Sequence, residues 1–222
     1  MTSQELGRIE RPPADRFAGK RKVYLVPLLF PQRDAPQGYS ERIDQYWEQV
    51  SQQVRSLEQR LSPVKRVYHE FISEGGDDGL KALETTNPAA HKLVLEKCLM
   101  GARLEPLEDR ETLQEMLDWE RCLLIGLVSQ KVATLVSESH AKASNSRNEH
   151  MARVLETTLK PEEAGLLIIS ERHRVQFPKD IEVFYVNPPA LDELRRWLRQ
   201  QQAEAHAQEQ ATEGESQNKQ PG

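Results

Sequence analysis

The chain has 222 residues, of which 37% are hydrophobic and 29% charged, and its formal net charge is -5, so it is long enough for one α/β domain with its own core and gives no reason to expect a nucleic-acid partner. No apolar run approaches the roughly 20 residues that a membrane span requires, and the N-terminus lacks the apolar segment of a signal peptide. We therefore predict a single cytoplasmic domain without a membrane span.

The first third of the chain predicts a strand, a helix and a second strand. Residues 1–20 are polar and indicate a flexible arm. Residues 22–30 form an apolar run that is typical of a strand covered on both faces. The helix predicted over 41–61 has apolar side chains at alternating four- and three-residue steps, and a strand follows over 64–72. This apolar seam fits a core-facing helix and also self-association, so a homo-oligomer stays open.

The next segment predicts a turn, a helix and a weak strand. Residues 75–79 are Gly-Gly-Asp-Asp-Gly, a composition typical of a solvent-exposed turn. Asn87 is a suitable cap for a helix over 88–101, which has proline at its first position. Residues 102–107 are at best an edge strand, because a proline interrupts them.

A long helical pattern occupies the centre of the chain, over residues 112–136. Its second half, residues 122–136, is apolar on nearly every side, which favours a helix buried between layers. Residues 137–148 are small and polar, and both a loop and a frayed helical connection fit them.

The stretch 146–186 is the most informative part of the sequence. Apolar side chains at helical spacing continue as far as Leu159, and residues 166–169 have the length and β-branching of a buried strand. His173 therefore leaves the sheet at the C-terminal end of a strand. Ligands bind at that edge in open α/β sheets, because loops and helix N-termini converge there.

The C-terminal part predicts a last strand, a last helix and a tail. Residues 181–186 fit a strand, and residues 191–198 fit a helix with one apolar side. Residues 201–222 have almost nothing to bury and predict a disordered tail. The alternation of strands and helices predicts an α/β domain over residues 21–200, with a mixed, mostly parallel sheet and helices on both faces.

Three charged clusters stand next to predicted strand or helix ends, namely His69-Glu70, Glu108-Asp109-Arg110 and Glu171-Arg172-His173. Histidine with a carboxylate is a ligand set for a divalent metal, which lowers the pKa of a bound water. Arg110 or Arg147 would instead hold a carboxylate or phosphate in a bidentate grip. Ordinary ion pairs and surface charge explain the same clusters without any site.

Four short motifs follow one another within residues 22–186. They are Val67-Tyr68-His69-Glu70 at a strand end, Gly101-Ala102 with Asp109-Arg110 and Thr112-Leu113, Arg147-Asn148 with Met151-Ala152 on a helix, and Ser170-Glu171-Arg172-His173 after an apolar strand. This order resembles the TraB/PrgY family and its relatives, which include the Tiki proteases. In those proteins a strand ends in Val-x-x-Glu, and a closing strand delivers Gly-x-x-His.

The resemblance implies a mixed α/β sheet with a polar pocket over the strand ends, and some relatives are described as metal-dependent peptidases. It implies that Glu70 and His173 act as catalytic acid–base groups or metal ligands, and that Arg147 is a catalytic residue that positions the substrate. The substrate-binding residues that it implies are Asp109, Arg110 and Asn148.

Two departures from the family pattern bear on the chemistry. The first strand lacks the Gly-x-x-His of the family, and Ser170 replaces the glycine before His173. His69 is no simple substitute for the missing imidazole, because it points away from Glu70 if the strand is regular. The site is then short of the three protein ligands that a catalytic metal needs.

Three hypotheses for the function stay open. The first is a divergent metal-dependent hydrolase or peptidase with a degenerate site, and the second is a non-catalytic module that binds a small molecule or peptide through Arg110 and Arg147. In the third, the arginines and carboxylates pair with each other and orient helices on the sheet.

Overall fold

Five parallel strands form one sheet in the part of the chain that the computed structural model describes, residues 19–32 and 35–217. The strand order is β3-β2-β4-β1-β5. The strands are β1 (Arg21–Pro27), β2 (Val64–His69), β3 (Arg103–Glu105), β4 (Ala164–Ile169) and β5 (Ile181–Tyr185). The predicted α/β class with a single domain is confirmed, but the sheet is parallel throughout where a mixed, mostly parallel sheet was predicted.

The central strand, β4, explains why residues 164–169 read as a continuous apolar run. All six of its residues are buried, because β1 and β2 flank it and helices cover both of its faces. Gly165 lets a neighbouring ring approach, since a Cβ at that position would lie 3.0 Å from the ring of Tyr68. The predicted edge strand is β3, which pairs only with β2.

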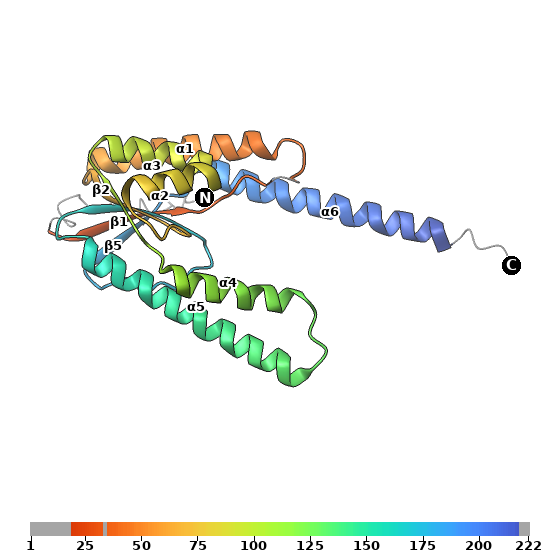
Figure 1. The fold of residues 1–222 in the computed structure, drawn as a ribbon. Helices are drawn as coiled ribbons and strands as arrows, with labels where there is room; N and C mark the ends of the chain where they lie inside the picture. The colour runs from red at the N-terminus through yellow and green to blue at the C-terminus, as the bar shows by residue number, and fades with distance from the viewer. Residues whose placement is uncertain (1–18, 33–34, 218–222) are drawn as a thin grey trace, which may run out of the picture.

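Four helices cover one face of the sheet, and Figure 1 shows three of them, α1, α2 and α3, stacked on it. They are α1 (Tyr39–Arg60), α2 (Gly76–Thr86), α3 (Pro88–Leu99) and α6 (Pro189–Gln217). The apolar seam of α1 lies in this core, with Ile43, Val50 and Val54 almost completely buried. The seam therefore faces the sheet, which is the core-facing role predicted from the sequence.

The opposite face is covered by α5 (Gln130–Thr158), which α4 (Arg110–Leu124) accompanies as a helical hairpin (Figure 1). Met151, Leu155 and Leu159 pack against the apolar side chains of β1 and β4. The first half of α5 extends past the sheet together with α4, so the hairpin projects from the body of the domain.

The buried helix predicted for residues 122–136 is wrong. The chain leaves α4 at Leu124, turns, and enters α5 at Gln130. Gly126 has φ +66°, a left-handed conformation that ends a helix at little cost. The apolar side chains on both sides of this turn are exposed. Residues 137–148, for which a loop was one prediction, lie inside α5.

The turn predicted for residues 75–79 is also wrong, because Gly76 begins α2, although residues 76–78 are exposed as predicted. Gly79 is buried, and a Cβ there would lie 2.2 Å from the carbonyl oxygen of Glu74. Gly75 and Gly79 therefore allow close packing, a role that composition alone does not separate from turn formation.

The two ends of the chain are described only in part. Residues 1–18 of the predicted arm lie outside the described residues, as do residues 218–222. Helix α6 continues as far as Gln217 and leaves the body of the domain (Figure 1), so residues 201–217 of the predicted tail are helical.

Candidate functional site

A cavity of about 650 Å³ opens at the C-terminal edge of the sheet, between the ends of β1, β2 and β4 and the α4–α5 hairpin. Residues after the three strands form its floor, and α5 supplies most of its wall. This edge is where parallel α/β sheets bind ligands. The volume also lies in the range of small-molecule sites.

Glu70 ties together the ends of two adjacent strands at the base of this cavity. Its backbone N–H donates to the carbonyl of Ile168 at 2.9 Å. One carboxylate oxygen, Oε2, accepts a hydrogen bond from the backbone N–H of Ser170 at 2.6 Å. The other, Oε1, accepts one from Nη2 of Arg147 at 2.9 Å. Both oxygens of this buried carboxylate are therefore engaged.

Arg147 bridges Glu70 and a second buried carboxylate, Glu108. Its Nε donates to Oε2 of Glu108 at 2.9 Å, and its Nη2 donates to Oε1 of the same residue, which gives a bidentate pair. Burial opposes the charge of the guanidinium, but the hydrogen bond and charge of Glu108, with the charge of Glu70, outweigh it and raise the pKa of Arg147. The network fixes α5 to the end of β2.

Phe71, which follows Glu70, has a strained backbone beside this network. Its φ is +70°, a conformation that costs a non-glycine residue about 1–3 kcal/mol. Its N–H donates to Oε1 of Glu108 at 3.1 Å. Its ring centroid lies 5.2 Å from the guanidinium carbon of Arg147 and 5.9 Å from the ring centroid of Phe30. Such strain is characteristic of functional sites.

His173 lies in the loop after β4, where it is half-buried and lines the same cavity as Glu70. Burial lowers the pKa of His173, and the negative charge of Glu70 offsets part of that effect. Its Nδ1 accepts a hydrogen bond from the backbone N–H of Val175 at 3.3 Å. In the neutral imidazole the proton is then on Nε2, so His173 offers a hydrogen-bond donor to the cavity.

Arg172 and Arg174 flank His173 and also line the cavity. Their backbone N–H groups are fixed, because Arg172 donates to Oγ of Ser170 at 3.2 Å and Arg174 donates to Oδ1 of Asn148 at 2.9 Å. Within residues 19–32 and 35–217, no carboxylate forms an ion pair with either guanidinium. Two cations on this loop therefore line the cavity without an ion-pair partner among the residues that the structure describes.

The structure brings together four of the six residues singled out from the sequence: Glu70, Arg147, Asn148 and His173 line one cavity. The other two, Asp109 and Arg110, lie outside it. Asp109 caps α4 by accepting from the backbone N–H of Thr112 at 2.9 Å, and the hydrogen bonds from Thr112 lower the pKa of that carboxyl. Arg110 forms an exposed ion pair with Glu74 at 2.6 Å.

The sequence did not single out Glu108. It is the one residue of the Glu108-Asp109-Arg110 cluster that pairs with Arg147. Leu107 and Glu108 both donate backbone hydrogen bonds to the carbonyl of Ile72, which holds this segment against the end of β2. The apolar residue before Glu108 could have indicated this position, because Leu107 is fully buried and Glu108 is buried beside it. The sequence also did not single out Arg172 and Arg174, because a charged turn resembles ordinary surface.

The cavity does not fit a catalytic divalent metal. No cluster of three or more His, Cys, Asp or Glu side chains suited to a metal ion is present in the described part of the chain. Both oxygens of Glu70 are engaged, and Nε2 of His173 carries a proton when Nδ1 accepts. His69 is buried with its Nε2 unpartnered, and burial lowers its pKa to about 4, but His69 does not line this cavity.

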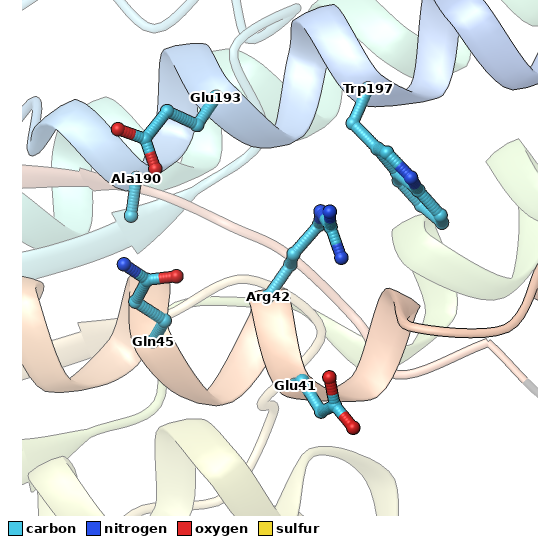
Figure 2. Close-up of a pocket in the computed structure, with 6 residues that line it drawn as sticks. All are labelled: Glu41, Arg42, Gln45, Ala190, Glu193 and Trp197. Atoms are coloured by element: carbon cyan, nitrogen blue, oxygen red, sulfur yellow. The ribbon is translucent and has the colours of Figure 1, made fainter.

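A second, smaller hollow of about 260 Å³ lies between α1 and α6 (Figure 2). Arg42 and Trp197 point toward each other across it, with the guanidinium carbon 4.6 Å from the ring centroid. Arg42 also donates to the carbonyl of Gly38 at 3.0 Å. Its charged group is thus already engaged, so we interpret this hollow as part of the packing between the two helices.

Comparison with known proteins identifies no family for this chain. No protein-family model, no curated protein and no solved structure matches the chain. No helix in the described ranges is both long enough and apolar enough to cross a membrane. The chain is an α/β protein with a parallel sheet, and the arrangement of its cavity is the basis for any statement about function.

Proposed function

We propose that this chain is a non-catalytic binding protein that holds a small anion, a carboxylate or a phosphate, in the cavity at the C-terminal edge of the sheet. One observation carries the proposal: Arg172 and Arg174 line the cavity without an ion-pair partner among the described residues, whereas the deeper cation, Arg147, is held by two carboxylates. Arg147 builds the site, and the two outer arginines are free to bind the ligand.

The polar groups around the cavity fit this ligand class. Arginine suits carboxylate and phosphate, because its planar guanidinium donates two parallel hydrogen bonds to their oxygens. The side chains of Ser144 and Asn145 line the wall beside the arginines, and His173 adds the N–H of Nε2. Donors thus line much of a space large enough for a small molecule, together with the carboxylates of Glu70, which is already engaged, and Glu120.

The alternative, a metal-dependent hydrolase, has less support. Its expected ligands, Glu70 and His173, do line one cavity. However, the carboxylate is held by Arg147 and by the backbone of Ser170, so binding a metal would break hydrogen bonds that join β2 to β4. We therefore derive no catalytic step for these residues.

Kinship with the TraB family is part of the same proposal. Its support is that the motif residues Glu70, Arg147, Asn148 and His173, which lie as much as 103 positions apart in sequence, surround one cavity. The departures noted above, a missing imidazole and Ser170 before the histidine motif, agree with a family scaffold that binds without the catalytic chemistry of its relatives.

Calorimetric titration with inorganic phosphate and, separately, with citrate tests the proposal. We expect one of the two anions to bind, which also separates the phosphate and carboxylate classes. The double variant Arg172→Gln/Arg174→Gln should weaken binding by about tenfold or more, the loss expected for charge-assisted hydrogen bonds. The matched control is Arg196→Gln/Arg199→Gln, which removes two exposed arginines from α6.

The proposal is overturned if neither anion binds, or if both double variants weaken binding equally, since general charge would then explain the effect. Titration with Zn²⁺ and Mn²⁺ gives a separate test. Tight binding of either metal that His173→Ala abolishes, at an unchanged melting temperature, would replace the anion site with the hydrolase alternative.

A further inference from the structure

The cavity at the C-terminal edge of the sheet has an apolar part that the proposed anion site leaves unused. Phe30, Phe71 and Met116 line this cavity together with the arginines. Among the residues that the structure describes, neither of the two apolar cores includes these three side chains. Apolar and aromatic side chains that line a cavity beside a few polar groups are typical of small-molecule sites.

Two of these side chains form an aromatic pair, although they come from strands that are not neighbours. Phe30 follows β1 and Phe71 follows β2, and β4 lies between these two strands. The two ring centroids nevertheless lie 5.9 Å apart, with the ring planes inclined by 50°. The segments after β1 and β2 therefore converge past the end of β4, and both rings line the cavity there.

The ring of Phe71 remains accessible from the cavity. Its guanidinium neighbour is Arg147, yet 38% of the surface of Phe71 is exposed. Phe71 also has a positive φ, which glycine would adopt without strain. A strained position that carries a partly exposed aromatic ring, and no core packing, fits a ring that contacts a ligand.

The cations of the cavity come from a different element. Arg172 and Arg174 belong to the loop after β4, whereas the aromatic pair belongs to the segments after β1 and β2. One cavity thus combines unpaired cations with an apolar lining. A molecule that satisfies both kinds of lining needs one anionic end and one apolar body.

We propose that the ligand is a small monocarboxylate with an aromatic or aliphatic body. The inference rests on the proposed anion site and deepens it by naming the ligand class. The carboxylate pairs with Arg172 and Arg174, because the guanidinium group matches its two oxygens. The body of the molecule packs against Phe30 and Phe71, where it is removed from water.

The other charges at the cavity favour a carboxylate over a phosphate. Glu70 and Glu120 line the same cavity, so each further negative charge on the ligand meets repulsion. A carboxylate has one charge, whereas a phosphate ester has about two at neutral pH. An apolar lining also makes a doubly charged group more costly to desolvate.

Titration of the isotope-labelled full chain with three matched probes, followed through its amide chemical shifts, tests the inference. Phenylacetate and acetate share the charge and differ in the ring, whereas phenylacetate and phenylacetamide share the ring and differ in the charge. We expect phenylacetate to bind about tenfold more tightly than acetate, since the ring buries apolar area. We expect it to bind more tightly than phenylacetamide as well, because the arginines need an anion.

Two variants separate the two halves of the cavity. Phe30→Ala should remove the preference for phenylacetate over acetate and leave the affinity for acetate unchanged. Arg172→Gln/Arg174→Gln should weaken binding of both anions by about tenfold or more. Tyr185→Ala is the matched aromatic control, because Tyr185 is exposed on β5, outside the cavity. The melting temperature of each variant verifies that it is folded, and the comparison of probes on the wild-type chain needs no variant.

Equal affinities for phenylacetate and acetate overturn the inference, but they leave the anion site in place if phosphate or citrate binds through the two arginines. Equal affinities for phenylacetate and phenylacetamide overturn the anion site itself, and the inference with it. Tighter binding of phenyl phosphate than of phenylacetate overturns the carboxylate as the charged end. A preference for the ring that Phe30→Ala leaves unchanged overturns the assignment of the apolar body to the aromatic pair.

Discussion

The two faces of the sheet use the same five strands for different purposes. On one face, α1, α2, α3 and α6 close an apolar core that extends over the whole length of the strands. On the other, the core beneath α5 contains fewer buried side chains. Beyond Met151 the wall becomes polar, and the cavity begins there. The first face is a closed apolar core, and the second combines a smaller core with a polar cavity.

This difference has a local cause at the end of β2. His69 and Glu70 are both buried, but the side chain of Glu70 belongs to the hydrogen-bond network with Arg147 beneath α5. Phe71, the next residue, adopts a left-handed conformation. Successive side chains of a strand alternate between its faces. The chain therefore passes from a closed core to a polar cavity within three residues.

The largest effect should follow from removal of the cation that fixes the open face. Arg147→Ala leaves Glu70 and Glu108 buried without a counter-charge, so we expect a loss of about 3–5 kcal/mol in the free energy of unfolding. Urea denaturation measures it. Arg153→Ala, on the exposed side of the same helix, should change stability by less than about 1 kcal/mol. Equal losses in the two variants would show that the network contributes nothing special.

The next effect concerns His69 and the dependence of the stability on pH. Burial lowers the pKa of His69 to about 4, whereas in the unfolded chain it keeps its ordinary value of 6.5. As the pH falls below 6.5 the unfolded state takes up the proton first, so stability present at neutral pH is lost on acidification. The gap between the two pKa values corresponds to a loss of about 3 kcal/mol in the free energy of unfolding between pH 7 and pH 4.

His69→Phe tests this effect, because phenylalanine fills the site and does not titrate. The free energy of unfolding of the variant, measured by urea denaturation at several pH values, should fall less steeply between pH 6.5 and pH 4 than that of the wild type. His91→Phe, at a partly exposed position on α3, is the control. Parallel pH profiles for wild type and His69→Phe would contradict the prediction.

The smallest effect concerns strain at the boundary between the two faces. Phe71→Ala removes the ring but keeps a side chain at positive φ, so the backbone strain remains. Phe71→Gly removes the ring and also the strain. Glycine adopts positive φ without strain, so we expect the glycine variant to be about 1 kcal/mol more stable than the alanine variant. Thermal unfolding of the pair measures the difference. A more stable alanine variant would mean that the backbone at this position is relaxed.

The periodic parts of the fold could be predicted from the sequence, since burial on one or both faces leaves a pattern. The seam of α1 and the continuous apolar run of β4 are examples. The hairpin was not predictable in the same way. Residues 122–136 are as apolar as a core helix, and composition does not show that a turn at Gly126 divides them and leaves most of their large side chains exposed.

The candidate site was predictable where topology dictates it. Parallel strands bring Glu70 and His173 to one edge whatever their separation in sequence. Prediction failed between immediate neighbours, because Glu108 enters the network while Asp109 caps a helix and Arg110 pairs at the surface. The direction of a side chain depends on the local backbone, which residue types alone do not fix.

The position of β4 in the sheet has a consequence for biosynthesis. β4 lies between β1 and β2, which precede it in the chain by more than 90 residues. A nascent polypeptide that has not yet emerged as far as Ala164 therefore offers β1 neither of its neighbours, and offers β2 only the three-residue β3. Pairing of β1 must therefore wait until the segment from Ala164 onward has been synthesised, and until then its apolar strand has both edges open to aggregation.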